Sequence, residues 1–143
     1  MKRLEVVIDT NVLVSALKSK RGASFKVLTL IGQSKFDINL SVPLILEYED
    51  VAKRLIGETA LNEEDIDDIL DYICSVSNCR EIFYLWRPFL KDPKDDMVLE
   101  LAVTSNCDMI ITYNKKDFKG VEKYFGIRVL SPKELLFEIG ELS

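Results

Sequence analysis

A short apolar run that ends abruptly in an acid constrains this chain more than any other feature. Residues 4–17 read LEVVIDTNVLVSAL, in which the β-branched run at 6–8 stops at Asp9 and a second apolar segment follows. Such a run without polar alternation is typical of a strand covered on both faces of a parallel sheet. Ligands of these sheets bind beyond the carboxyl ends of the strands, where Asp9 lies. Asp9 is therefore either the N-cap of the next helix or a working acid, and both readings stay open.

The composition excludes several kinds of chemistry. The 143 residues, 48% hydrophobic and 30% charged, predict a single globular domain over residues 1–143. The chain has no His, which excludes a His-based triad, a His general base and His-ligated zinc. Three cysteines without C-x-x-C spacing, and no export signal, predict reduced thiols in a cytoplasmic protein. No apolar run approaches the roughly 20 residues of a membrane span, so we expect no membrane contact.

Strand-like and helix-like segments alternate along the whole chain. We expect strands at residues 4–9, 36–40, 80–85, 108–112 and 127–130. We expect helices from residue 11 to about 17 and at residues 24–33, 43–55, 62–76, 93–105 and 132–139. The second of these helices is expected to bury a stripe that includes Phe25, Leu28 and Ile31. This alternation predicts an α/β fold with a parallel sheet and helices on both of its faces.

Two further groups of acids stand at predicted helix starts. Glu47 lies early in the helix 43–55 and borders its apolar stripe, although an acid near a helix N-terminus is also favourable on its own. Asp92 precedes a proline and is expected to cap the next helix, with Asp95 as the acid of a capping box. Helical spacing directs Asp95 toward the packed side and Asp96 toward the flank. Three carboxylates within five residues repel one another unless a cation or several donors compensate them.

A fourth acid follows the strand predicted at residues 108–112. Thr112, Asn114 and Asp117 come at or just after the carboxyl end of this strand. The carboxyl ends of parallel strands share one edge, so four acids are expected to converge there: Asp9, Glu47, Asp95 and Asp117. Mg²⁺ or Mn²⁺ prefers carboxylate and water oxygens and is the natural compensation for such a cluster. A cation held in this way supports in-line attack of water on a phosphodiester, without a protein nucleophile.

Four segments together resemble the PIN-domain ribonucleases. They are VIDTNVLVSAL, SVPLILEYEDV, DPKDDMVLELA and DMIITYNKKDF, in the order and at the spacing of that family. The resemblance covers nearly the whole chain. It implies a single three-layer α/β/α sandwich with a mostly parallel central sheet, and metal-dependent endonuclease activity on single-stranded RNA. It further implies a toxin of a prokaryotic toxin–antitoxin pair, held by a small antitoxin and commonly a homodimer.

The same resemblance assigns roles to single residues. Asp9, Glu47 and Asp95 match the metal-holding acids, and Asp117 matches a fourth, more variable acid. Some members have an acid where this chain has Asn114. That difference implies weak or substrate-dependent binding of a second metal, with Asp96 as an alternative ligand. Two polar residues are expected to orient the acids through hydrogen bonds, and they are Asn11 and Thr112.

An RNA substrate needs local positive charge, because the chain as a whole carries a net charge of −5. Phosphate contacts are expected from Lys18, Lys20, Arg21, Lys115 and Lys116, and further cations near the acids are Lys53, Arg54 and Lys119. The sequence is equally consistent with each of them being an ordinary surface residue. Trp86 and Tyr113 are candidates for stacking on unpaired bases, although Trp86 also fits a packing role.

Two other functions compete with the nuclease interpretation. A haloacid-dehalogenase-like phosphatase also begins with an acid after its first buried strand, but it needs a second acid two residues later. Asn11 stands at that position and cannot supply the proton. A catalytically silent module that binds RNA or a protein is the second alternative. Metal-dependent cleavage, as opposed to metal-independent binding, distinguishes it from the nuclease.

Overall fold

The computed structural model describes residues 3–82 and 89–141, and it contains a five-stranded sheet in which every strand pair is parallel. The strand order is β3-β2-β1-β4-β5. The strands are β1 (Leu4–Ile8), β2 (Phe36–Leu40), β3 (Asn78–Cys79), β4 (Met109–Ile111) and β5 (Arg128–Leu130). The helices are α1 (Thr10–Lys18), α2 (Ala23–Leu30), α3 (Val42–Lys53), α4 (Glu63–Val76), α5 (Pro93–Thr104), α6 (Val121–Phe125) and α7 (Pro132–Glu138), with a 3₁₀ turn, η1, at Lys115–Phe118.

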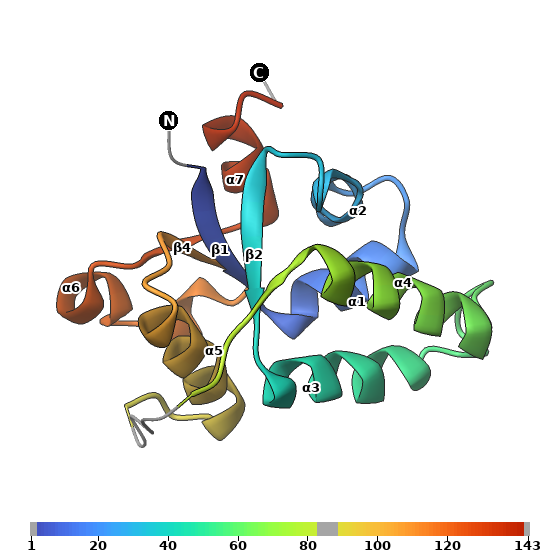
Figure 1. Cartoon of the computed structure of the whole chain (residues 1–143), viewed down its shortest axis with the longest axis horizontal. Helices are drawn as coiled ribbons and strands as arrows, with labels where there is room; N and C mark the ends of the chain where they lie inside the picture. The colour runs from blue at the N-terminus through green and yellow to red at the C-terminus, as the bar shows by residue number, and fades with distance from the viewer. Residues whose placement is uncertain (1–2, 83–88, 142–143) are drawn as a thin grey trace.

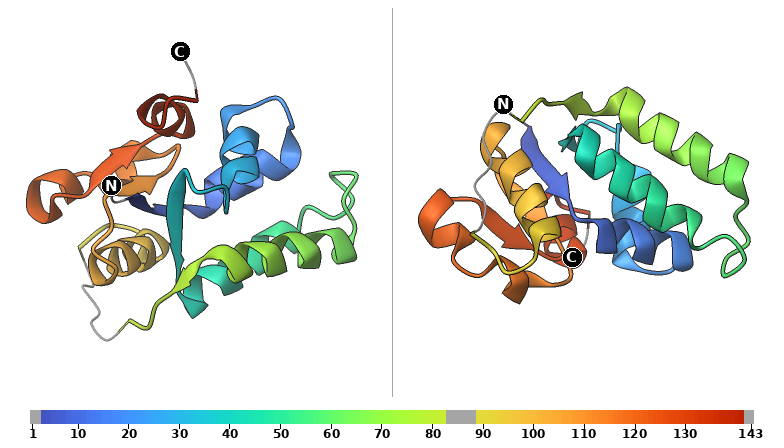
Figure 2. Two further views of the ribbon diagram at one scale, coloured as in Figure 1. Left: turned by 45° about the horizontal axis from the view of Figure 1, so that its top comes forward. Right: turned by 90° about the horizontal axis from the view of Figure 1, so that it is seen from below.

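Helices cover both faces of the sheet, which confirms the predicted α/β sandwich. The chain first proceeds from β1 to β3 in one direction and places α1 to α4 on one side (Figure 1). It then returns past β1 to β4 and β5, and α5 and α6 lie on the other side (Figure 2). This change of side follows from the right-handed crossover that parallel strands require. The strand order therefore reverses between β1 and β4, which makes their carboxyl ends the topological switch point.

Burial and register align the two strands at this switch point. Val6, Val7 and Ile110 are fully buried, as expected for strands with helices on both faces. Val6 pairs with Met109, and two residues later Ile8 pairs with Ile111. The ladder continues for one more residue, since the backbone N–H of Asp9 donates to the carbonyl of Ile111 at 2.9 Å. Asp9 and the residue after Ile111 are thus carried to the same point of the sheet edge.

Two sequence-based expectations need correction. Of the stripe expected on the second helix, Ile31 is buried, but Phe25 and Leu28 are half-buried, and Ser24 and Val27 face the core from α2 instead. The hydroxyl of Ser24 tolerates burial because it donates to Ser15 Oγ on α1 at 2.9 Å. The strand expected at residues 80–85 is instead β3, whose pairing with β2 ends at Cys79. Residues 83–85 of that prediction lie outside the described residues. None of the helices in the described ranges has the length and apolar character needed to cross a membrane.

Candidate active site

Asp9 lies at the switch point and is both a helix cap and a member of the acidic edge. Its Oδ1 accepts the backbone N–H of Thr10 at 2.8 Å, which caps α1. Its Oδ2 accepts the hydroxyl of Thr112 at 2.9 Å and the amide of Asn11 at 3.4 Å. The side chain is only 8% exposed, and this burial raises the pKa of Asp9 above its ordinary value, while the two closest hydrogen bonds oppose the rise. Asp9 can therefore be both the N-cap of α1 and a working acid.

A network of polar groups fixes the direction of this carboxylate. The Asn11 amide also donates to Thr112 Oγ1 at 3.2 Å, and Asn11 Oδ1 accepts the backbone N–H of Tyr113 at 3.3 Å. Thr112 Oγ1 in turn accepts the backbone N–H of Asn114 at 3.1 Å. Both side chains expected to orient the acids, Asn11 and Thr112, thus contact Asp9 directly. Asn114 itself is exposed and precedes the turn η1.

Glu47 reaches the same edge from the second turn of α3. Its Oε2 accepts the hydroxyl of Thr10 at 2.7 Å, and its Oε1 lies 3.6 Å from the ammonium nitrogen of Lys94. The next residue, Tyr48, is buried and donates its hydroxyl to the carbonyl of Ile8, which anchors α3 to the end of β1. The carboxyl groups of Asp9 and Glu47 are near enough to that phenol to raise its pKa further above 10 than burial alone does. The sequence did not indicate the contacts with Thr10 and Lys94.

Asp95 completes the cluster from the first turn of α5. Burial is the largest cause of a rise in its pKa from 3.8 to about 7, and repulsion from Asp9, Asp92, Asp117 and Glu47, in this order, supplies the rest. Asp117, in the exposed turn η1, also raises the pKa of Asp9. The four acids expected from the sequence therefore share one electrostatic field at the carboxyl edge of the sheet.

Asp92 and Asp96 have separate structural tasks. Asp92 caps α5 by accepting the backbone N–H of Lys94 at 2.9 Å, in place of the Asp95 N–H that a capping box requires. The placement of Asp96 on the flank is wrong, because its side chain is 1% exposed. Its Oδ1 accepts the backbone N–H of Leu90 at 2.8 Å and fixes the turn before the helix. Asp96 thus supports the segment that carries Asp95.

An open hollow of about 640 Å³ adjoins Asp95 and Asp117. Its lining combines acids, cations and apolar groups, namely Phe89, Leu90, Lys91, Asp92, Asp95, Lys116, Asp117 and Lys119. The wall contributed by Phe89 and Lys91 was not expected from the sequence. Both residues come from an aperiodic stretch, and only the position of the segment before α5 brings them to the acids.

The other expected RNA contacts are distributed unevenly. Lys20 and Arg21 line a second hollow with Lys133 between α2 and α7, and Lys18 is exposed at the end of α1. Lys115 forms an ion pair with Glu134 at 2.9 Å. The cations late in α3 are engaged by neighbouring acids on α3 and α4, Lys53 with Glu49, Glu63 and Asp67, and Arg54 with Asp50. The hydroxyl of Tyr113 donates to Ser24 at 3.0 Å, and Trp86 lies outside the described residues.

The donor set at the edge suits a hard divalent cation. Asp9, Glu47, Asp95 and Asp117 present only oxygen, and after burial their mutual repulsion is the next cause of the raised pKa of Asp95. In residues 3–82 and 89–141, no three acids are already spaced to hold one ion. Both Glu47 oxygens are engaged, by Thr10 and Lys94, so a small side-chain movement would have to accompany metal binding.

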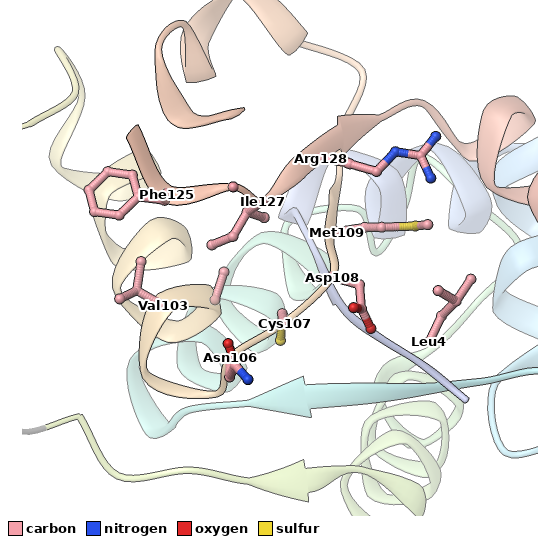
Figure 3. A pocket seen from close by; sticks show the side chains of 11 residues that line it. Leu4, Val103, Asn106, Cys107, Asp108, Met109, Phe125, Ile127 and Arg128 are labelled. Carbon is pink, nitrogen blue, oxygen red and sulfur yellow. The ribbon is translucent and has the colours of Figure 1, made fainter. Parts of the chain in front are cut away.

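A further cavity, of about 410 Å³, lies at the opposite edge of the sheet (Figure 3). It adjoins the amino ends of β1, β4 and β5, where Leu4, Asp108 and Arg128 line it. Asp108 accepts the backbone N–H of Glu5 at 2.8 Å and so serves the sheet. Burial raises the pKa of the Cys107 thiol to about 12, which keeps it protonated and unreactive at neutral pH. Asp108 and Cys107 therefore do not make this cavity a competing catalytic site.

Comparison with known proteins identifies the family and the fold. The chain is 32% identical over 149 residues to the uncharacterized protein MJ1680 of Methanocaldococcus jannaschii, over 95% of this chain and 92% of that protein. Solved structures of VapBC-1 from nontypeable Haemophilus influenzae and of DNA-bound VapBC from Salmonella typhimurium share the fold, with TM-scores of 0.62 and 0.59. Both are 16% identical and cover 90% of this chain and 98% of their own.

A third solved structure with this fold is VapBC2 from Rickettsia felis bound to a promoter DNA fragment. It has a TM-score of 0.57 and 15% identity, and it covers 88% of this chain and 97% of its own. The model of the PIN domain matches residues 5–116, which include Asp9, Glu47 and Asp95. Because this match spans most of the chain and the fold agrees, the chain belongs to the PIN-domain family.

Proposed function

We propose that this protein is a divalent-metal-dependent endoribonuclease that hydrolyses phosphodiester bonds in single-stranded RNA. The observation that carries the proposal is the convergence of four acids on the switch point. Repulsion from Asp9, Asp117 and Glu47 contributes to the rise in the pKa of Asp95 to about 7. Acids that raise one another's pKa in this way repel one another when they are ionised, and a bound cation removes this repulsion. Membership of the PIN-domain family, typically nucleases, supports the same activity.

The residues at the edge have distinct tasks in this reaction. Asp9, Glu47, Asp95 and Asp117 would hold Mg²⁺ or Mn²⁺, which when bound lowers the pKa of water and neutralises charge on the phosphate. Thr112 and Asn11 keep the Asp9 carboxylate directed outward from β1. As the water oxygen bonds to phosphorus the P–O ester bond breaks, and the proton that the water loses to solvent is balanced by the one that the departing oxygen takes up.

The biological setting we propose is a toxin–antitoxin pair in the cytoplasm. The solved VapBC structures with this fold support a small antitoxin protein as partner. We further propose a homodimer, as the resemblance to the family implies. Size-exclusion chromatography with light scattering would give about twice 16.4 kDa for the chain alone if it dimerises.

The test is cleavage of a mixed single-stranded RNA pool with Mg²⁺, with Mn²⁺ and with EDTA. Glu47→Gln and Asp9→Asn should abolish metal-dependent cleavage, since each removes one carboxylate from the edge. Glu49→Gln is the matched control, because Glu49 lies on the same helix and is exposed. Cleavage that survives both edge variants would contradict the proposal.

One observation favours the alternative of a catalytically silent binding module. Lys94 and Thr10 already engage both oxygens of Glu47, which is how a side chain is held when no cation is required. In that case wild type and Asp9→Asn would bind RNA equally with and without metal, and neither would cleave it.

A further inference from the structure

We propose that Phe89 is a stacking platform for one unpaired RNA base in the hollow beside the acids, and so a residue that positions the substrate. This inference rests on the proposed function and extends it to a defined subsite. Phe89 lines the same 640 Å³ hollow as Asp95 and Asp117. A base held on this ring therefore lies next to the place where a phosphodiester would meet the acids.

The ring of Phe89 is held in place by two other aromatic residues. It meets Tyr124 edge-on, with centroids 5.9 Å apart and planes at 78°, and Phe125 likewise at 5.1 Å and 76°. Gly120 lies under this cluster with a φ of +90°, and a Cβ there would stand 3.7 Å from Phe89 and 3.5 Å from Tyr124. The three rings thus form one packed unit, which presents a ring of fixed orientation.

Phe89 is nevertheless 39% exposed, although it takes part in this packing. A ring that served the core alone would gain free energy from complete burial. The part that remains open faces a hollow whose volume is in the ordinary range of ligand sites. An aromatic surface held open beside acids that suit phosphodiester chemistry is what stacking of a base requires.

The charges around the ring select the class of ligand. Lys91, Lys116 and Lys119 line the hollow, and all three are exposed. Cations beside an aromatic face are the pattern by which proteins hold single-stranded nucleic acid, with lysines on phosphates and rings on bases. The hollow also contains Asp92, Asp95 and Asp117, so a purely apolar peptide would match neither its positive nor its negative groups. The combination therefore favours a nucleotide of the RNA as the occupant.

The test couples the ring to a single base. A ten-nucleotide single-stranded RNA is prepared with one abasic ribose at each position in turn. Its binding to Asp9→Asn protein in Mg²⁺ is measured by fluorescence anisotropy. At one position, loss of the base should weaken binding about 5- to 150-fold, the usual range for a stacked base. In Asp9→Asn protein that also carries Phe89→Leu, loss of the same base should weaken RNA binding by less than twofold.

Controls separate stacking from a general loss of structure. Phe89→Trp should restore or increase the penalty for the abasic position, because the larger ring stacks at least as well. Phe137→Leu is the matched control, since Phe137 is 54% exposed on α7 and does not line the hollow. If Phe89→Leu lowers the melting temperature, the comparison of wild-type Phe89 with Phe89→Trp carries the test alone.

Several results would overturn this inference, and they differ from a failure of the proposed nuclease. If the abasic position weakens RNA binding equally with and without the Phe89 ring, the platform is rejected even if the protein cleaves RNA. A coupled penalty without any cleavage by wild type keeps the platform and rejects the nuclease. If no abasic position in the RNA series weakens binding, and an antitoxin segment protects Phe89 instead, the hollow is a protein-binding site.

Discussion

Replacing Asp95 by Asn should stabilise the metal-free protein at high pH, although it removes a group from the candidate active site. The pKa of Asp95 is raised from 3.8 to about 7 by burial and by the surrounding acids. Because the folded state holds this proton more tightly than the unfolded state, the contribution of Asp95 to stability is largest below about pH 4. It is lost as the pH rises through 7.

The magnitude follows from the same shift. One pKa unit corresponds to about 1.4 kcal/mol, so the rise from 3.8 to about 7 sets an upper bound of about 4 kcal/mol. Asp95 is only partly buried, and solvent screening reduces the expected gain to about 1–2 kcal/mol. The amide of Asn has similar shape but no charge, so Asp95→Asn should recover this amount at pH 8 and almost none at pH 4.

The assay is urea unfolding in EDTA at pH 4, 6 and 8, for wild type and Asp95→Asn. Asp96→Ala provides a contrast on the adjacent residue, because the buried Asp96 accepts the Leu90 N–H and its loss should cost about 1–3 kcal/mol. Saturating Mg²⁺ should then stabilise wild type more than Asp95→Asn. The reasoning fails if Asp95→Asn is destabilising at pH 8, or if its effect is the same at all three pH values.

Three further outcomes are expected. Thr112→Val should lower the free energy of unfolding by about 1–3 kcal/mol and reduce cleavage at least tenfold, with Thr112→Ser restoring both, because the buried hydroxyl donates to Asp9. Lys94→Gln should change the free energy of unfolding by less than about 1 kcal/mol, because the ammonium of Lys94 is exposed. It should lower the Mg²⁺ concentration for half-maximal cleavage, since the ammonium no longer competes with the cation at Glu47. Leu99→Ala should cost about 2–5 kcal/mol in a urea titration and leave the metal requirement unchanged, because Leu99 is fully buried.

The main features of the candidate site follow from local sequence patterns. Residues 6–8 of the strand Leu4–Ile8 are buried on both faces and must end at the sheet edge, so the position of Asp9 is fixed as soon as the strand is recognised. The strand at Met109–Ile111 has the same signature, and the register of the two strands brings Thr112 to Asp9. Only the structure, through the pairing of strands distant in the sequence, shows which of the residues at this edge are in contact.

Periodicity failed where a helix is buried on nearly all sides. From Asp96 to Ala102, every residue of α5 is buried. A helix in such surroundings has no polar face, so spacing could not tell that Asp96 points inward. The buried position of its carboxylate depends on the Leu90 N–H, a partner six residues away in a turn without a repeating pattern. The platform formed by Phe89 was missed for the same reason, since its aromatic neighbours, Tyr124 and Phe125, are more than thirty residues distant.

The double role of Asp9 decides how the active edge has to be probed. Its carboxylate caps α1 through Thr10 and anchors the switch point through Thr112, so removal of the whole side chain perturbs the fold and the chemistry together. Asn keeps an acceptor for the Thr10 N–H, although its amide would meet Thr112 Oγ1, which already accepts from Asn11 and Asn114, so these polar contacts must rearrange. Asp9→Asn therefore removes the charge while it preserves most of the cap. A loss of cleavage in this variant at unchanged stability would assign the activity to the charge of Asp9, whereas Asp9→Ala could not separate the two.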